Sequence, residues 1–173
     1  MRTLAVLAAG AACVNVAPVP TPIGNGPRYR LAAAPAVVAA GAAIGRLRCS
    51  PGDASRIEAH VELFADKRAL LLPTRIGVSR KGACSYPVRT EAPTGVVQTV
   101  ASAKATVADL FAIWGQPFSA DRIASFRGPV HAWVGGCPWT GSVGSIPLAR
   151  HAEIVLEVGG YVPPHRSFIF PPG

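Results

Sequence analysis

The segment 106–117 reads TVADLFAIWGQP and predicts the main helix of the fold. Large apolar side chains recur at the i, i+3, i+4 and i+7 positions, which share one helix face: Val107, Leu110, Phe111 and Trp114. A helix of about ten residues is marginal alone in water, so this face must pack against other elements. Short apolar runs on both sides of the segment indicate a sheet as that partner.

Both ends of this helix carry residues that start and stop helices. Thr106 suits the N-cap, and Asp109 three residues later stands where a capping-box acid favours the positive end of the helix dipole. Gly115 and Pro117 predict the end of the helix, because glycine adopts the left-handed C-cap backbone and proline cannot continue the helix.

Apolar alternation predicts strands before and after the helix. The segment 57–64 (IEAHVELF) places aliphatic side chains on one face and Glu58, His60 and Glu62 on the other, as expected for a half-buried strand. A turn at 65–68 leads to a strand at 70–72, continued at 74–78 beyond a proline. The other expected elements are extended segments at 84–91, 96–100, 130–134 and 154–158, a short helix at 119–126, and an aromatic C-terminal cover at 161–173.

This order, with hairpins on both sides of one helix, predicts an α+β fold. The expected architecture is a small, mostly antiparallel sheet packed on one main helix in a β-grasp-like layout. A small β-sandwich or an open barrel is the alternative. In the first layout the sheet face opposite the helix carries the polar side chains, and function is expected there.

Composition divides the chain into residues 1–48, predicted as an export signal with an Ala/Pro-rich tether, and residues 49–173, predicted as a single α+β domain. A short apolar run ending in small residues precedes Cys13, which resembles a bacterial lipoprotein signal and makes Cys13 a candidate for lipidation. A second apolar stretch at 31–45 fits a signal core, a short membrane anchor or a linker, since a spanning helix needs about 20 residues. We therefore expect a protein that is secreted or anchored at the cell envelope, with the N-terminus as the membrane tether.

The formal net charge of +8 raises nucleic acid or an anionic membrane as a partner. The basic residues are scattered singly, and no run is longer than Arg80-Lys81. Aromatic residues are not interleaved with them, so no specific nucleic-acid partner is expected.

Three cysteines lie in the predicted domain, and thiols of exported proteins tend to pair. We predict a disulfide between Cys49 and Cys84, because each flanks a predicted strand in the first half of the sheet. Cys137 is then free, or it is the true partner of one of them. Three buried thiols are the remaining alternative.

Ligand-type side chains share one face of the first predicted strand. Neighbours at i and i+2 on a strand stand about 6 to 7 Å apart, so adjacent members of Glu58, His60 and Glu62 can share a cation. Glu91, on a later extended segment, is a fourth candidate for this divalent-metal site. The alternative is a solvated polar face, which is normal for an antiparallel sheet.

A Cys-His pair made by Cys137 with His131 or His151 is the one catalytic candidate. The sequence has no nucleophile elbow, Walker loop or dinucleotide-binding fingerprint. An enzyme is therefore not the expected function.

The region from Cys49 onward carries a series of short motifs. They include Ile57-x-Ala-His60-Val, Cys84-x-Tyr86, Phe111-x-x-Trp114-Gly115, His151-x-Glu153-Ile154 and Phe170-Pro171. These motifs resemble those of a group of exported, uncharacterised bacterial proteins with a His-rich first strand (His-x-His-x-His … Cys-x-Tyr-Trp-x-His-Thr-His). The resemblance implies export and the same fold.

In that group the histidine cluster suggests a metal or proton-handling site. Here Arg56 and Glu58 stand at the first two histidine positions, while Arg89 and Glu91 replace the later His-Thr-His pair, so His60 remains from the cluster. The sequence thus favours an exported, non-catalytic binding domain, with a metal-binding protein that uses a degraded His/Glu site as the alternative.

Overall fold

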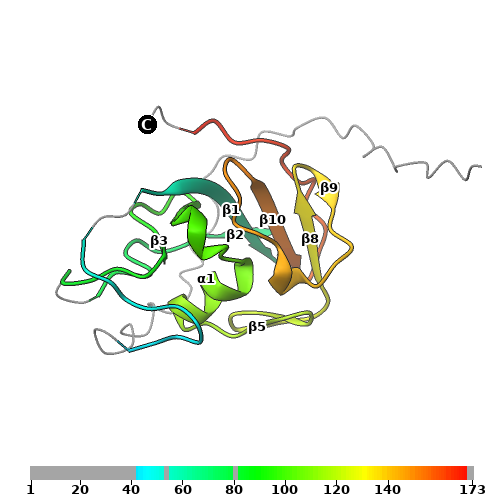
Figure 1. Ribbon diagram of the computed structural model, residues 1–173. Coiled ribbons are helices and arrows are strands. Elements are labelled where there is room, and N and C mark those ends of the chain that lie inside the picture. The colour runs from blue at the N-terminus through cyan, green and yellow to red at the C-terminus, as the bar shows by residue number, and fades with distance from the viewer. Residues whose placement is uncertain (1–41, 53–54, 80–81, 171–173) are drawn as a thin grey trace, which may run out of the picture.

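The computed structural model describes residues 42–52, 55–79 and 82–170. Its large sheet has the strand order β3-β4-β1-β10-β8-β9, and β2 pairs with β1 further along the same edge as β4 (Figure 1). The strands are β1 (Ile57–Ala65), β2 (Arg68–Leu70), β3 (Val88–Arg89), β4 (Val96–Thr99), β8 (Val130–Val134), β9 (Cys137–Pro138) and β10 (Glu153–Val158). Two short 3₁₀ turns, η1 (Ala101–Ala103) and η2 (Val143–Ser145), and one α-helix, α1 (Val107–Trp114), complete the main elements.

The first and last long strands, β1 and β10, run parallel at the centre of the sheet, and the other pairs in the described residues are antiparallel. With β4 outside β1 and β8 outside β10, this is the predicted β-grasp-like layout. The α+β fold class is confirmed. The sheet does not close into a barrel, and the helix α1, in place of a second large sheet, packs on its core face.

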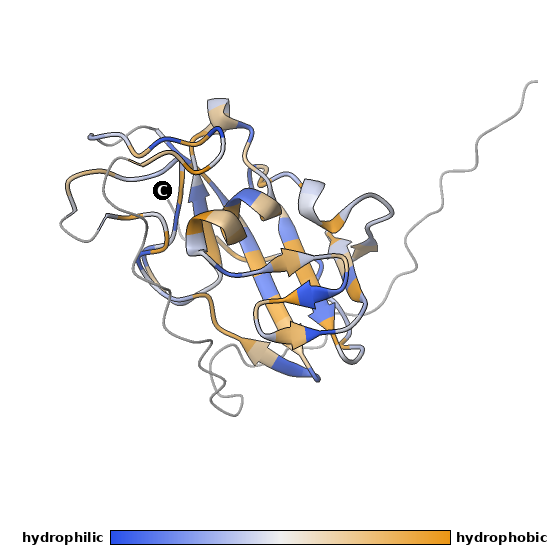
Figure 2. Ribbon diagram, turned by 90° about the horizontal axis from the view of Figure 1, so that it is seen from below, coloured by the Kyte–Doolittle hydropathy of each residue, from blue (hydrophilic) through white to orange (hydrophobic). Residues whose placement is uncertain are grey.

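Helix α1 covers one face of the sheet and supplies much of the core (Figure 2). Phe111 and Trp114 are fully buried among sheet residues such as Val61 and Leu156, as the apolar stripe predicts. Burying side chains of this size contributes roughly 1.5–3 kcal/mol each before the entropy of ordering is subtracted.

Both predicted helix ends are present. The backbone N–H of Thr106 donates to the Asp109 carboxylate at 2.9 Å, the reciprocal half of a capping box. The same carboxylate accepts a 2.7 Å hydrogen bond from Arg46, which ties the chain before β1 to the start of the helix. Gly115 ends α1 with a φ of 74°, a conformation that glycine adopts without strain.

The predicted hairpin after β1 forms, but its second strand lies earlier than expected. Asp66 and Lys67 both have positive φ, as a two-residue turn that matches the strand twist requires. This tight turn sets β2 at Arg68–Leu70 in place of 70–72. The expected continuation at 74–78 is a turn followed by a single bridge at Val78.

The helix predicted at 119–126 is wrong. This region forms a small antiparallel sheet of three two-residue strands: β5 (Phe118–Ser119), β6 (Arg122–Ile123) and β7 (Phe126–Arg127). Ser119 and Asp121 hydrogen-bond to each other within the first turn, which competes with a helix. Pairing also lets Phe118 stack on Phe111 at 4.2 Å while Ile123 is fully buried.

The C-terminal segment 161–170 is the predicted extended cover, and it crosses the sheet face opposite α1 (Figure 1). Its aromatic rings pack on rings that the sheet side presents: Phe168 on His60, Tyr161 on Trp133 and Phe170 on His151. Both faces of the sheet centre are therefore shielded from water.

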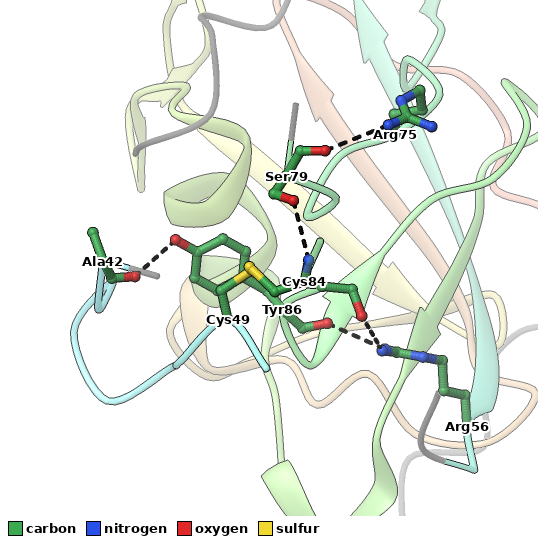
Figure 3. The surroundings of a disulfide bond; sticks show 8 residues. Ala42, Cys49, Arg56, Arg75, Ser79, Cys84 and Tyr86 are labelled. Atoms are coloured by element: carbon green, nitrogen blue, oxygen red, sulfur yellow. Dashed lines mark hydrogen bonds between the residues drawn. A yellow bond between two sulfur atoms is a disulfide. The ribbon is translucent and has the colours of Figure 1, made fainter. Parts of the chain in front are cut away.

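The predicted disulfide joins Cys49 to Cys84, with the two Cα atoms 5.4 Å apart (Figure 3). Close by, the Tyr86 hydroxyl donates to the Ala42 carbonyl at 2.8 Å, and Arg56 donates to the carbonyls of Tyr86 and Pro87. The Cys49–Cys84 disulfide fits an oxidising compartment.

Residues 42–48, predicted as tether, pack onto the domain. Leu47 is 3% exposed and belongs to the core, and Ile44 packs against it. The export signal, the second apolar stretch up to residue 41 and the lipidation candidate Cys13 lie outside the described residues. In the part of the chain that is described, no helix is both long and apolar enough to cross a membrane.

Replacing both Cys49 and Cys84 by serine should lower the free energy of unfolding by about 3–4 kcal/mol, because the bond closes a loop of 35 residues in the unfolded chain. Urea denaturation of the oxidised wild type and the double variant measures this difference. A loss below about 1 kcal/mol would contradict the loop-closure argument.

Candidate functional site

His60 lies at the centre of the covered sheet face, with only 1% of its surface exposed. The parallel register places it beside Glu153, and Nδ1 lies 3.0 and 2.9 Å from the two carboxylate oxygens. Nε2 lies 2.9 Å from the Thr94 carbonyl oxygen. The Phe168 ring stacks on the imidazole with centroids 3.8 Å apart. The imidazole of His60 is therefore in contact with Glu153, Thr94 and Phe168.

Gly95 makes this close packing of His60 possible. A Cβ at position 95 would lie 2.7 Å from His60 Nε2 and 2.9 Å from the Val61 carbonyl oxygen. The φ of 81° at Gly95 also favours glycine. The loop before β4 can therefore approach the imidazole closely enough for Thr94 to accept its hydrogen bond.

The contacts of His60 decide where its protons lie. A carbonyl oxygen can only accept, so Nε2 carries a hydrogen and donates to Thr94. The lone pair of an unprotonated Nδ1 would repel the oxygens of an ionised Glu153 carboxylate, so one proton must lie between Nδ1 and Glu153. The pair is either a neutral carboxylic acid with imidazole or an imidazolium with carboxylate, and a cation can take the place of that proton.

The pKa of Glu153 is raised above its ordinary value mainly by burial. The hydrogen bond from His60 and its charge oppose the rise, whereas the nearby Glu62 carboxylate adds to it. Two carboxyl groups thus share a buried position, with Glu153 2% exposed and the Glu62 side chain 9% exposed.

Glu62 extends the cluster toward the C-terminal segment. Its Oε1 lies 3.9 Å from His60 Nδ1, and its Oε2 lies 2.7 Å from His165 Nδ1. The side chain of Glu62 is only 9% exposed. Glu62 from β1 and His165 from the C-terminal segment therefore adjoin the pair that His60 and Glu153 form.

Among the described residues, His60, Glu62 and Glu153 form a group whose donor atoms all lie within 4.8 Å of one another. A cavity of about 40 Å³ adjoins them and is lined by His60, Glu62 and His165 together with residues of β2 and the loop at Gly95. We name His60, Glu62, Glu153 and His165 the His60 cluster. Its donor set suits a divalent cation, and the cavity has room for an ion or a few waters.

The structure brings only two of the four predicted metal ligands together, His60 and Glu62. Glu58 shares their strand face but accepts a hydrogen bond from Gln98 on β4 at 3.2 Å, and Glu91 pairs with Arg89 at 2.9 Å. Gln98 on the neighbouring strand β4, and Arg89 two residues before Glu91, thus engage these two carboxylates away from His60.

Sequence reasoning did not assign Glu153 and His165 to the cluster. Glu153 directly precedes the predicted last strand at 154–158, and its spacing of two and four residues from Val155 and Glu157 was the available signal that it shares their face. The sequence pattern does not set the register of that strand against β1, and His165 lies in a segment without periodicity.

The Cys-His candidate does not form a nucleophile. In the described part of the chain no cysteine has a free thiol, and this includes Cys137. The His151 ring stacks on Phe170, and the His131 ring lies 6.2 Å from the Trp133 ring.

Glu157, four residues after Glu153 on the same face of β10, is a second buried carboxyl with 1% exposure. Burial raises its pKa to about 7, although the Val162 N–H that donates to Oε1 at 3.0 Å acts in the opposite direction. Glu157 is thus partly protonated near neutral pH.

Comparison with known proteins finds no matching family model, and neither a curated protein nor a solved structure matches the chain.

Replacing Glu157 by glutamine should remove part of the pH dependence of stability. The folded pKa of about 7 exceeds the ordinary value of 4.5, so the folded state binds the proton more tightly and wild-type stability falls as pH rises through this window. Between pH 5 and pH 8 the wild type should lose about 2–3 kcal/mol more than Glu157→Gln. Urea denaturation at both pH values measures the difference.

Other titratable groups near Glu157 are common to both proteins and cancel in this comparison. They are His131 on β8, Tyr161 on the C-terminal segment, and Asp66 and Lys67 at the turn beside Gly159 and Gly160. Equal losses in the wild type and Glu157→Gln would show that the carboxyl titrates normally in the folded protein.

Proposed function

We propose that this chain is an exported, non-catalytic domain that binds a divalent transition-metal ion at the His60 cluster. The observation that carries the proposal is the convergence of His60, Glu62 and Glu153, whose donor atoms lie within 4.8 Å of one another in a buried position. Buried charges in proteins are normally paired or bound to a metal, because desolvation of an isolated charge is costly.

Charge balance supports a divalent ion. The cluster contains two carboxyl groups, and as carboxylates they need two positive charges in a region of low dielectric. Two protons shared with His60 and His165 meet this need at low pH. A divalent cation meets it with both imidazoles neutral, the form that ligates metals.

The distances also suit a metal. Ligand atoms about 2 Å from a tetrahedral Zn²⁺ ion lie about 3.4 Å from one another. His60 Nδ1 is 2.9 Å from Glu153 and 3.9 Å from Glu62, so the present spacing brackets that value. His60 Nε2 donates to Thr94, which is the outer contact that typically fixes the tautomer and orientation of a ligating histidine.

The cover over the cluster favours binding over catalysis. Catalytic zinc sites keep an open coordination position for water or substrate, whereas structural sites are closed. Here the Phe168 ring stacks on His60, and His60 and Glu153 are 1% and 2% exposed. The cluster therefore resembles a closed site more than a reaction centre.

Two features support export. The composition of residues 1–48 fits a signal and tether, and the Cys49–Cys84 disulfide suits an oxidising compartment. Cell fractionation tests this part separately: recovery of the full-length protein only from the cytoplasm would contradict it.

Untagged protein should bind one equivalent of Zn²⁺, and binding should raise the thermal midpoint. Glu153→Gln and His60→Gln should each weaken the affinity by at least about 100-fold, because outer contacts alone are typically worth about 10- to 100-fold. Binding should release up to two protons and tighten as pH rises. Competition with a chelator, elemental analysis and calorimetry in buffers of different ionisation enthalpy measure these quantities.

The matched controls are Glu58→Gln and Glu91→Gln, which remove a carboxylate near the same sheet face but outside the cluster. Both controls should bind zinc like the wild type. Absence of stoichiometric metal, or a loss in Glu58→Gln as large as in Glu153→Gln, would overturn the proposal. Circular dichroism of each variant confirms that the fold is retained.

A further inference from the structure

A recess at the other end of the covered sheet face has a different composition from the His60 cluster. It is an open recess with a volume of about 350 Å³, at the lower end of the roughly 300–1,000 Å³ typical of small-molecule sites. Glu157, Trp133, Tyr161 and His131 line it, and we name it the aromatic recess. It shares no residue with the His60 cluster, and four strand residues, about 13 Å, separate Glu153 from Glu157.

The Glu157 carboxyl group has no cationic partner among the described residues. Its Oε1 accepts the Val162 N–H, and within the described residues Oε2 makes no hydrogen bond and no ion pair. The residue is 1% exposed yet lines the recess. A buried carboxylate that faces a cavity in this way is stabilised by a cation that enters the cavity.

The walls of the recess suit a cation that also carries apolar groups. The Trp133 and Tyr161 rings lie 5.9 Å apart with an angle of 60° between their planes, so they form two sides of a corner. The His131 ring lies 6.2 Å from Trp133. Aromatic faces attract ammonium groups through the ring quadrupole, and rings together with a carboxylate form the usual cage for alkylated ammonium ions.

We propose that the aromatic recess binds an organic ammonium ion, with Glu157 as its counter-ion and Trp133 and Tyr161 as its aromatic walls. The ammonium group lies against Glu157 Oε2, and its alkyl groups contact the two rings. The net charge of +8 repels cations at long range, so affinity comes from these short contacts. Salt screens the long-range part, with a Debye length of about 8 Å at physiological ionic strength.

The raised pKa of Glu157 gives this site a pH signature. Binding needs the carboxylate form, and with a pKa of about 7 the ionised fraction rises from pH 6 to pH 8. The affinity should increase by about tenfold over that range and binding should release a proton. The other titratable groups around the recess are His131 on β8, Tyr161 on the C-terminal segment, and Asp66 and Lys67 at the turn beside Gly159 and Gly160.

The test uses choline as the probe and titrates the full chain by NMR or calorimetry at fixed ionic strength. The control ligand is 3,3-dimethylbutan-1-ol, which has the shape of choline without its charge. Choline should bind at least tenfold more tightly than the alcohol at pH 8. Glu157→Gln should abolish this preference, and Trp133→Leu should weaken choline binding.

Trp139→Leu and Glu91→Gln are matched controls outside the recess and should bind choline like the wild type. Equal binding of choline and the alcohol, no binding of either, or choline binding that survives Glu157→Gln would overturn the proposal. Binding of methyl glucoside in place of choline would do the same and would identify a sugar site. Glu157→Gln also removes a buried ionisable group, so it should stay folded during the test.

Discussion

The parallel pairing of β1 with β10 is the interaction on which the rest of the structure depends. It aligns His60 through Ala65 with Glu153 through Val158 and thus joins the two ends of the domain at the centre of the sheet. On one side the register sends Val61 and Leu156 into the core under α1. A shift by one residue would exchange the two faces and place Glu153 in that core, so the apolar packing fixes the polar arrangement on the other side.

The C-terminal segment covers the sheet face opposite α1, and the polar side chains on that face are therefore buried. The polar side of an antiparallel sheet is normally solvated, and its ion pairs contribute little. Here the segment 161–170 lies over it, and His60, Glu153 and Glu157 are almost completely shielded. Each carboxyl then requires its own compensation: Glu153 shares a proton with His60, and Glu157, with its pKa raised to about 7, keeps its proton below neutral pH and accepts a backbone N–H.

The sequence contained enough information for the elements whose local pattern agrees with the packing. The apolar stripe of α1, its capping residues and the alternation in β1 and β8 all follow from periodicity, and the order of hairpins around one helix predicted the layout. The short strands at 118–127 were not predictable, because they depend on packing: Phe118 stacks on Phe111 of α1, and Ile123 is buried in the common core. For the site, strand alternation identified His60 and Glu62, whereas Glu153 entered through a pairing across 93 residues that local patterns do not encode.

The C-terminal segment contacts the surroundings of both carboxyls of β10. Val162 donates to Glu157, and a few residues later His165 and Phe168 contact Glu62 and His60. A rise in pH removes protons from both carboxyls, and the resulting charges favour water over burial. A cation beside either carboxyl takes the place of the lost proton and offsets the cost of burying the charge. Positive charge at each carboxyl therefore favours the arrangement in which the C-terminal segment covers this face of the sheet.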